Sequence, residues 1–294
     1  MKSNYIEFKK QRELGEILSD TFAFFRNEFK PFFTTFFTIV GPFLAAMIVS
    51  LIMYLYFAGN TLNIMTFDYD MDAVSLATTA IIGLIYILSW IAVYTMSQST
   101  VLHYIKSYAN GKGTIDVETI RKEVYDSFWN FIGLGIMVGL SIVIGTIFCV
   151  IPGVYLYVPL SLSFCVLVYN RMGASEAYNY SFNLVKDEWW MTFVTIFVIG
   201  IIVGVASYVF AVPTAIYQWI KMGVFSGELD AEGMMDIFKD PIYILFNVIS
   251  TVAQFLLNLI SIIAGAFIYF NLNEKKNFTG TYERIDSLGE IREN

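Results

Sequence analysis

Five stretches of this chain contain no charged residue, and each is long enough to cross a lipid bilayer as a helix. They cover residues 31–67, 73–105, 127–170, 189–220 and 241–273. A spanning helix needs roughly 20 apolar residues, because each residue rises about 1.5 Å. The third stretch has room for two helices, which we expect to fold back at Ile151-Pro152-Gly153. The pattern therefore predicts six transmembrane helices.

The composition agrees with a membrane protein. Apolar residues make up 57% of the 294 positions and charged residues 15%, whereas about a quarter of a soluble domain is charged. Backbone polar groups in hydrocarbon must be hydrogen-bonded within the structure, so only helices and closed barrels cross membranes. The apolar stretches lack the alternation of β-strands. The predicted fold class is therefore an all-α, polytopic membrane protein.

Basic residues concentrate on alternate connections between the predicted spans. Of the 18 Lys and Arg residues, only Lys221 and Lys239 fall on the other connections, which leaves 18 − 2 = 16 on one side. Basic residues near helix ends are retained in the cytoplasm, so we expect both termini there. The opposite loops are acidic, with Asp68, Asp70 and Asp72 in the first. No basic patch suggests a nucleic-acid partner.

An internal repeat divides the chain. Residues 15–33 align without a gap on residues 175–193, which pairs Glu16 with Glu176 and Thr21 with Ser181. The same alignment places Arg26 on Lys186. A third copy is indicated by Asp126-Ser127-Phe128, which matches Asp20-Thr21-Phe22. The predicted units are residues 11–110, 115–172 and 174–273, followed by a cytoplasmic tail at 274–294, all within one membrane domain.

Each unit begins with a segment whose apolar residues recur at spacings of three and four. The three stripes are Leu14, Leu18, Thr21, Phe25 and Phe29; Val117, Ile120, Val124, Phe128 and Phe131; and Ala177, Ser181, Val185 and Trp189. Such stripes are typical of amphipathic helices lying in the cytoplasmic interface.

The bases on these segments have two interpretations. The simpler is anchorage, in which bases and aromatic residues fix the depth of the following span. The more specific interpretation is that these bases recognise lipid head groups, since each base near an anionic leaflet contributes about 1 kcal/mol of attraction. The candidate head-group contacts are Arg26, Lys30, Arg121, Lys122 and Lys186.

A polar seam follows one face of the last predicted span. Its residues are Asn247, Thr251, Gln254, Asn258 and Ser261. Polar groups in hydrocarbon are costly unless paired or hydrated, so we expect this face to point into the bundle. It would either form interhelical hydrogen bonds or line a hydrated cavity for a substrate or a lipid head group. A weaker polar cluster comprises Thr95, Ser97, Gln98, Ser99 and Thr100.

Small residues predict where the spans approach closely. Glycine or serine recurs four residues apart at Gly135 and Gly139, at Gly200 and Gly204, and at Ser261 and Gly265. Such pairs let helix backbones pack tightly in lipid.

Catalytic and metal-binding patterns are missing. No predicted span contains a carboxylate or a base, which disfavours ion-coupled transport. His103 is the single histidine, and Cys149 and Cys165 are the two cysteines, too few for a zinc site or an activated nucleophile. The aspartates at 68, 70 and 72 resemble the start of a calcium loop, but Ala73 replaces the turn glycine and Thr79 the closing glutamate. We therefore predict a protein that is no enzyme and binds no cofactor or metal.

Several motifs together resemble a known family. They are Ile17-Leu18-Ser19-Asp20-Thr21-Phe22, Pro42, Ile151-Pro152-Gly153-Val154-Tyr155-Leu156, Gly173-Ala174-Ser175-Glu176-Ala177 and Ser181-Phe182-Asn183-Leu184-Val185. They look like the six-helix membrane domain that precedes the catalytic domain in some bacterial glycerophosphoryl diester phosphodiesterases and that also occurs alone. The family's activity resides in a separate soluble barrel, which has no counterpart here.

The resemblance implies a membrane module of the bacterial cytoplasmic (inner) membrane. The predicted function is that of a non-enzymatic module that associates with membrane lipids or with another membrane protein. The alternative is a lipid or small-solute translocator that uses the polar seam.

Overall fold

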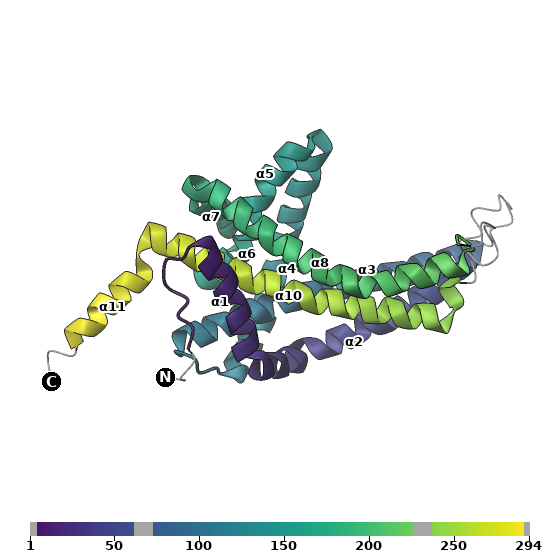
Figure 1. The fold of residues 1–294 in the computed structure, drawn as a ribbon, viewed down its shortest axis with the longest axis horizontal. Coiled ribbons are helices and arrows are strands. Elements are labelled where there is room, and N and C mark those ends of the chain that lie inside the picture. The colour runs from purple at the N-terminus through teal and green to yellow at the C-terminus, as the bar shows by residue number, and fades with distance from the viewer. Residues whose placement is uncertain (1–4, 62–72, 226–236, 291–294) are drawn as a thin grey trace. The chain divides into compact units, whose positions relative to one another are not determined.

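The computed structural model describes residues 5–61, 73–225 and 237–290, and every regular element in these ranges is helical (Figure 1). Six helical segments are long and apolar enough to cross a membrane. They are Phe29–Ala58, Ala73–Asn110, Val117–Phe148, Val150–Tyr169, Ala174–Lys221 and Pro241–Asn277. The predicted all-α class is confirmed, and the six apolar helices are those expected of a multi-pass membrane protein. Asp68, Asp70 and Asp72 lie outside the described residues.

Ten α-helices are described. In chain order they are α1 (Leu14–Asn27), α2 (Phe29–Thr61), α3 (Ala73–Asn110), α4 (Val117–Phe148), α5 (Val150–Ser161), α6 (Ser163–Tyr169), α7 (Ala174–Val185), α8 (Trp189–Lys221), α10 (Pro241–Asn277) and α11 (Thr279–Glu290). A 3₁₀ turn, η2 (Lys186–Glu188), joins α7 to α8. The chain forms two compact units: Met1–Ile39, Thr95–Ile201 and Leu259–Asn294 make unit 1, and Val40–Tyr94 and Ile202–Asn258 make unit 2.

The described part of unit 2 contains four long helical segments, from α2, α3, α8 and α10, and a 3₁₀ turn, η3 (Ile237–Lys239). Each long segment has about 20 residues, close to what one bilayer crossing requires. Many of its large apolar side chains are exposed, as lipid-facing residues should be. A polar contact ties the end of α8 to the residue before α10: Tyr217 Oη donates to Asp240 Oδ2 at 2.7 Å, and Lys221 Nζ lies 3.0 Å from the same oxygen. Desolvation raises the pKa of Asp240, but the hydrogen bonds from Tyr217, Lys221 and the Ile242 N–H, with the positive charge of Lys221, outweigh it and lower the pKa to about 2.

Aromatic rings fill the core of unit 1. Phe8 of the N-terminal segment stacks on Phe267 of α10, with ring centroids 4.3 Å apart, and meets Phe24 of α1 edge-on at 5.3 Å. Tyr108 of α3 meets Phe24 edge-on at 5.1 Å. All four rings are fully buried. Because aromatic side chains each bury a large apolar area, this cluster fastens the N-terminal segment and α1 to α3 and α10.

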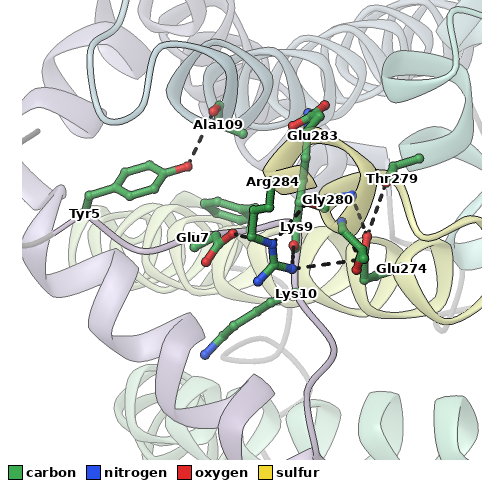
Figure 2. Close-up of polar contacts among 12 residues, drawn as sticks. Tyr5, Glu7, Lys9, Lys10, Ala109, Glu274, Thr279, Gly280, Glu283 and Arg284 are labelled. Atoms are coloured by element: carbon green, nitrogen blue, oxygen red, sulfur yellow. Dashed lines mark hydrogen bonds and ion pairs between the residues drawn. The ribbon is translucent and has the colours of Figure 1, made fainter. Parts of the chain in front are cut away.

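The N-terminal segment also contacts α11 (Figure 2). Lys9 Nζ lies 2.5 Å from Glu283 Oε1, and Arg284 Nη2 donates to the Lys9 carbonyl at 3.4 Å. The buried carboxylate of Glu274 accepts from the backbone N–H groups of Gly280 (2.7 Å) and Thr281 (2.9 Å). These N–H groups lie in the first turn of α11, where no intrahelical acceptor exists, so Glu274 caps that helix.

The turn between α4 and α5 differs from the prediction. The chain reverses at Cys149, which is extended (φ −172°, ψ 149°), while Ile151, Pro152 and Gly153 belong to the first turns of α5. Proline is tolerated there because the first N–H groups of a helix have no intrahelical acceptor. Gly153 is therefore not a turn residue; it allows α5 to approach α4 closely. Its Cα lies 3.2 Å from the position that a Cβ added to Gly145 of α4 would occupy. Cys149 is exposed, Cys165 is buried, and both are free thiols.

Four of the five glycines predicted to let spans approach closely have no close neighbour in the described part of the chain. A Cβ added at Gly139, Gly200, Gly204 or Gly265 would meet no atom within 4 Å, and one at Gly135 would only touch the Phe164 ring at 4.0 Å. Spacing places two small residues on one face of a helix, but it does not decide whether another helix lies against that face.

The protein core takes up parts of the three predicted stripes. In α1 the buried positions are Ile17, Thr21 and Phe24, of which only Thr21 belongs to the predicted stripe. Phe24 is buried because it enters the aromatic core of unit 1. Ile120, Val124 and Phe131 are buried in α4, and Ala177, Ser181 and Val185 in α7. That the stripes face the membrane interface stays a prediction.

Candidate functional site

Several basic side chains in unit 1 are held by acids. Lys106 Nζ lies 2.9 Å from Glu123 Oε1, and Lys275 Nζ lies 2.9 Å from Glu188 Oε1. Arg12 is buried, its Nε 2.9 Å from Asp20 Oδ2. These pairs join helices to one another, so their charges are not available to a ligand.

The five bases predicted to contact lipid head groups differ from these paired bases in that no acid in the described part of the chain holds them. Arg26, Lys30, Arg121, Lys122 and Lys186 are all exposed. Among the described residues, none of their side chains forms an ion pair or a hydrogen bond with another residue. Each of these side chains is therefore accessible to a ligand at the protein surface.

Lys186 lies in a groove of about 800 Å³ between the start of α5 and the start of α8. The groove is lined by Val150, Ile151, Val154, Tyr155, Lys186, Asp187, Glu188, Trp189, Trp190, Met191 and Phe193. Trp189 stacks between two neighbours, with ring centroids 5.4 Å from Tyr155 and 5.3 Å from Phe193. Its indole N–H donates to the Tyr155 carbonyl at 3.3 Å. The groove thus has long apolar walls and a charged end, where Lys186 stands beside the carboxylates of Asp187 and Glu188, the second of which is paired with Lys275.

Lys30 lies in a second, shallow groove of about 670 Å³, which the first turns of α2 form by themselves. Its lining is Phe29, Lys30, Phe33, Thr34, Phe37 and Thr38. Phe29, Phe33 and Phe37 form a ladder with consecutive ring centroids 4.7 and 5.7 Å apart. This groove also combines one unpaired amine with an apolar, mainly aromatic surface.

A cation beside an apolar wall suits an amphiphile with an anionic head group. The amine attracts the negative charge, the aromatic rings favour the boundary between water and hydrocarbon, and the wall accepts an acyl chain. Arg26, Arg121 and Lys122 line neither groove, although each remains exposed. Of the five candidates, the structure therefore brings Lys30 and Lys186 into shaped sites.

The predicted polar seam is not buried. Gln254 is exposed, and Asn247, Thr251, Asn258 and Ser261 are half-buried. Gln254 donates to Ser250 Oγ at 2.6 Å, one turn earlier on the same helix. The expectation that this face points into the bundle is wrong for Gln254. The helical period correctly placed the five residues on one face. A hydrogen bond within the same helix lowers the free-energy cost of exposing the Gln254 side chain at the protein surface, so this face need not be buried.

The weaker cluster is the buried one. Thr95, Ser97, Gln98, Ser99 and Thr100 are all buried near the end of α3. Ser99 Oγ lies 3.0 Å from Ser127 Oγ, and His103 bonds locally through Nδ1 to the Ser99 carbonyl at 2.8 Å. The buried hydroxyls of Ser163, Thr192 and Thr195 also belong to unit 1 and were missed. A lone hydroxyl inside an apolar stretch gives no sequence pattern that could identify it.

Among the described residues, no three His, Cys, Asp or Glu side chains gather into a group that could hold a metal ion. Comparison with protein-family models, with curated proteins and with solved structures finds no match to this chain.

Proposed function

We propose that this chain is a non-enzymatic, multi-pass protein of the bacterial inner membrane that binds anionic lipid at its cytoplasmic surface. The observation that carries the proposal is the pair of grooves, each with one unpaired lysine next to exposed aromatic and apolar side chains. Three other bases of unit 1, Arg12, Lys106 and Lys275, are instead paired with acids. The resemblance to the membrane domain of glycerophosphoryl diester phosphodiesterases supports the same kind of module.

The orientation belongs to the proposal. Both grooves lie on the side of the sequence that carries 16 of the 18 basic residues, counted as 18 minus Lys221 and Lys239. The positive-inside rule assigns that side, together with both termini, to the cytoplasm. The inner leaflet of a bacterial membrane is where anionic head groups would meet these lysines.

The repeat relates the aromatic walls of the two grooves. Under the alignment of 15–33 with 175–193, Phe29 and Phe33 of one groove correspond to Trp189 and Phe193 of the other. The lysines do not correspond, because Lys186 aligns with Arg26 and Lys30 with Trp190. The helices that precede the two grooves begin alike. Glu16 accepts from the backbone N–H of Glu13 at 3.0 Å, and Glu176 accepts from that of Gly173 at 3.2 Å. We propose that α1, the start of α4, and α7 are the interfacial helices of three related units.

Removing the two groove lysines should release bound anionic lipid. We expect Lys30→Gln combined with Lys186→Gln to weaken retention at each groove about fivefold, since a base near an anionic leaflet contributes about 1 kcal/mol. Native mass spectrometry of protein extracted from membranes containing phosphatidylglycerol and phosphatidylethanolamine would count the retained lipids.

The matched control is Lys112→Gln combined with Arg171→Gln. These two bases are also exposed and have no ion pair with a described residue, but they line neither groove. The control should retain phosphatidylglycerol like the unmodified protein. Equal losses from both double variants would show that general surface charge holds the lipid, and no loss from either would remove the lipid sites altogether.

A further inference from the structure

The hairpin formed by α4, α5 and α6 carries two of the six helical segments that are apolar enough to cross a bilayer. Its position within unit 1 can be judged from contacts between α5 and the start of α8. α8 begins at Trp189, directly after Lys186, Asp187 and Glu188. A charged turn followed by paired tryptophans is typical of the boundary where a helix enters the membrane.

A hairpin that crossed the bilayer would put its tip on the far side, about 30 Å from that boundary. Tyr155 is six residues beyond Cys149, or about 9 Å along a helix. In a crossing hairpin Tyr155 would therefore stand about 20 Å from Trp189. In the structure Trp189 Nε1 donates to the Tyr155 carbonyl at 3.3 Å, and the two rings stack.

Two further contacts give the same result. Val150 and Ile151, at the tip itself, line one groove with Lys186 and Glu188. Ser141 of α4 bonds to Tyr178 of α7 through their hydroxyls at 2.9 Å. α7 belongs to the same connection as the charged turn, so the outer half of the hairpin lies at the level of α7 and of the start of α8.

The tip of the hairpin exposes large apolar side chains, which contact with water would disfavour. Ile147, Phe148, Val150 and Ile151 surround the turn at Cys149, and their exposed fractions are 78%, 83%, 67% and 76%. No charged residue occurs between positions 127 and 170. An exposed apolar patch of this kind marks a surface that another apolar phase covers. The neighbouring Trp190 and Lys186, typical of a lipid interface, identify that phase as acyl chains.

We infer that the α4–α6 hairpin enters the leaflet next to Lys186 and Trp189 and returns to the same side. Its tip then inserts among acyl chains without crossing, and α2, α3, α8 and α10 are the four crossings. An even number of crossings keeps both termini on one side. The inference rests on the proposed function in one respect, the assignment of that side to the cytoplasm.

Cys149 is a natural reporter for this inference, because it is the exposed thiol at the tip and Cys165 is buried. The protein with Cys165→Ala would be expressed in a bacterial host and treated with a charged, membrane-impermeant maleimide in spheroplasts and in inverted vesicles. Two controls lack both native thiols: one carries Phe225→Cys, at the opposite end of α8, and the other Lys112→Cys, in the α3–α4 connection.

We expect Phe225→Cys to react in spheroplasts and Lys112→Cys in inverted vesicles. Cys149 should react about tenfold or more slowly than the reactive control in each preparation, because hydrocarbon excludes the charged reagent. A lipid-soluble maleimide should label Cys149 in both preparations.

Two results would overturn the hairpin inference. Reaction of Cys149 in spheroplasts at the rate of Phe225→Cys would mean that the hairpin crosses. Reaction in inverted vesicles at the rate of Lys112→Cys would mean that the tip lies in water. The controls test the proposed orientation separately, because an inverted protein would exchange their reactivities while Cys149 stayed slow in both preparations.

Discussion

Gly153→Ala should destabilise the protein by about 1–3 kcal/mol, because it forces extra volume into a closely packed helix contact. A Cβ at this position would overlap the Thr146 hydroxyl and stand 3.1 Å from the Thr146 Cα. The obstructing Cα belongs to the backbone of α4 and cannot rotate away. The hairpin would have to open at its tip, which also displaces the wall of the Lys186 groove.

The control for this prediction is Gly139→Ala on α4, where an added Cβ meets nothing within 4 Å. Alanine in an unobstructed helix is favoured over glycine by about 0.5–1 kcal/mol, so this variant should be neutral or slightly more stable. Thermal unfolding of the two purified variants in detergent measures the difference. Equal midpoints would mean that α4 and α5 are not in close contact at Gly153.

Glu274→Ala should release α11 from unit 1. The substitution removes the acceptor of two backbone N–H groups and of the Thr281 hydroxyl, which donates at 2.6 Å. The Gly280 N–H is buried in this contact, and each buried donor left unpaired costs about 1–3 kcal/mol. Hydrogen–deuterium exchange in residues 279–286 should therefore rise strongly.

Glu283→Ala provides the comparison, because it removes a carboxylate from the same helix at an exposed position. Its ion pair with Lys9 lies at the surface (Figure 2), where such pairs contribute at most about 1 kcal/mol. We expect little change in exchange from this variant. If Glu274→Ala exchanged as slowly as Glu283→Ala, the capping role of Glu274 would be wrong.

The long helices could be predicted from the sequence, because a span is defined by the absence of charge over a sufficient length. The same criterion cannot distinguish a helix that crosses from one that returns. Residues 127–170 are apolar enough for either, and the distinction depends on where Tyr155 meets Trp189. That contact joins positions 34 residues apart and leaves no local pattern.

The polar residues show a similar limit. Helical periodicity identifies which side chains share a face, and it grouped Asn247, Gln254 and Asn258 correctly. The direction of that face depends on neighbouring helices, so the seam was expected to be buried while the cluster around Ser99 is the one that the structure buries. Likewise, all five candidate bases could be named from the sequence, but only the structure shows which other bases are neutralised by acids.

Binding of anionic lipid at the Lys186 groove can be tested most directly by photocrosslinking in membranes. A photoreactive phenylalanine analogue at Trp190 would lie in the groove, and the same analogue at Trp129, which is similarly exposed (73% against 76%), would lie outside it. The lipids captured at each position would be identified by mass spectrometry. We predict that Trp190 captures phosphatidylglycerol in excess of its share of the membrane, whereas Trp129 captures lipids in proportion to the bulk. The same lipid composition at both positions would contradict a selective site.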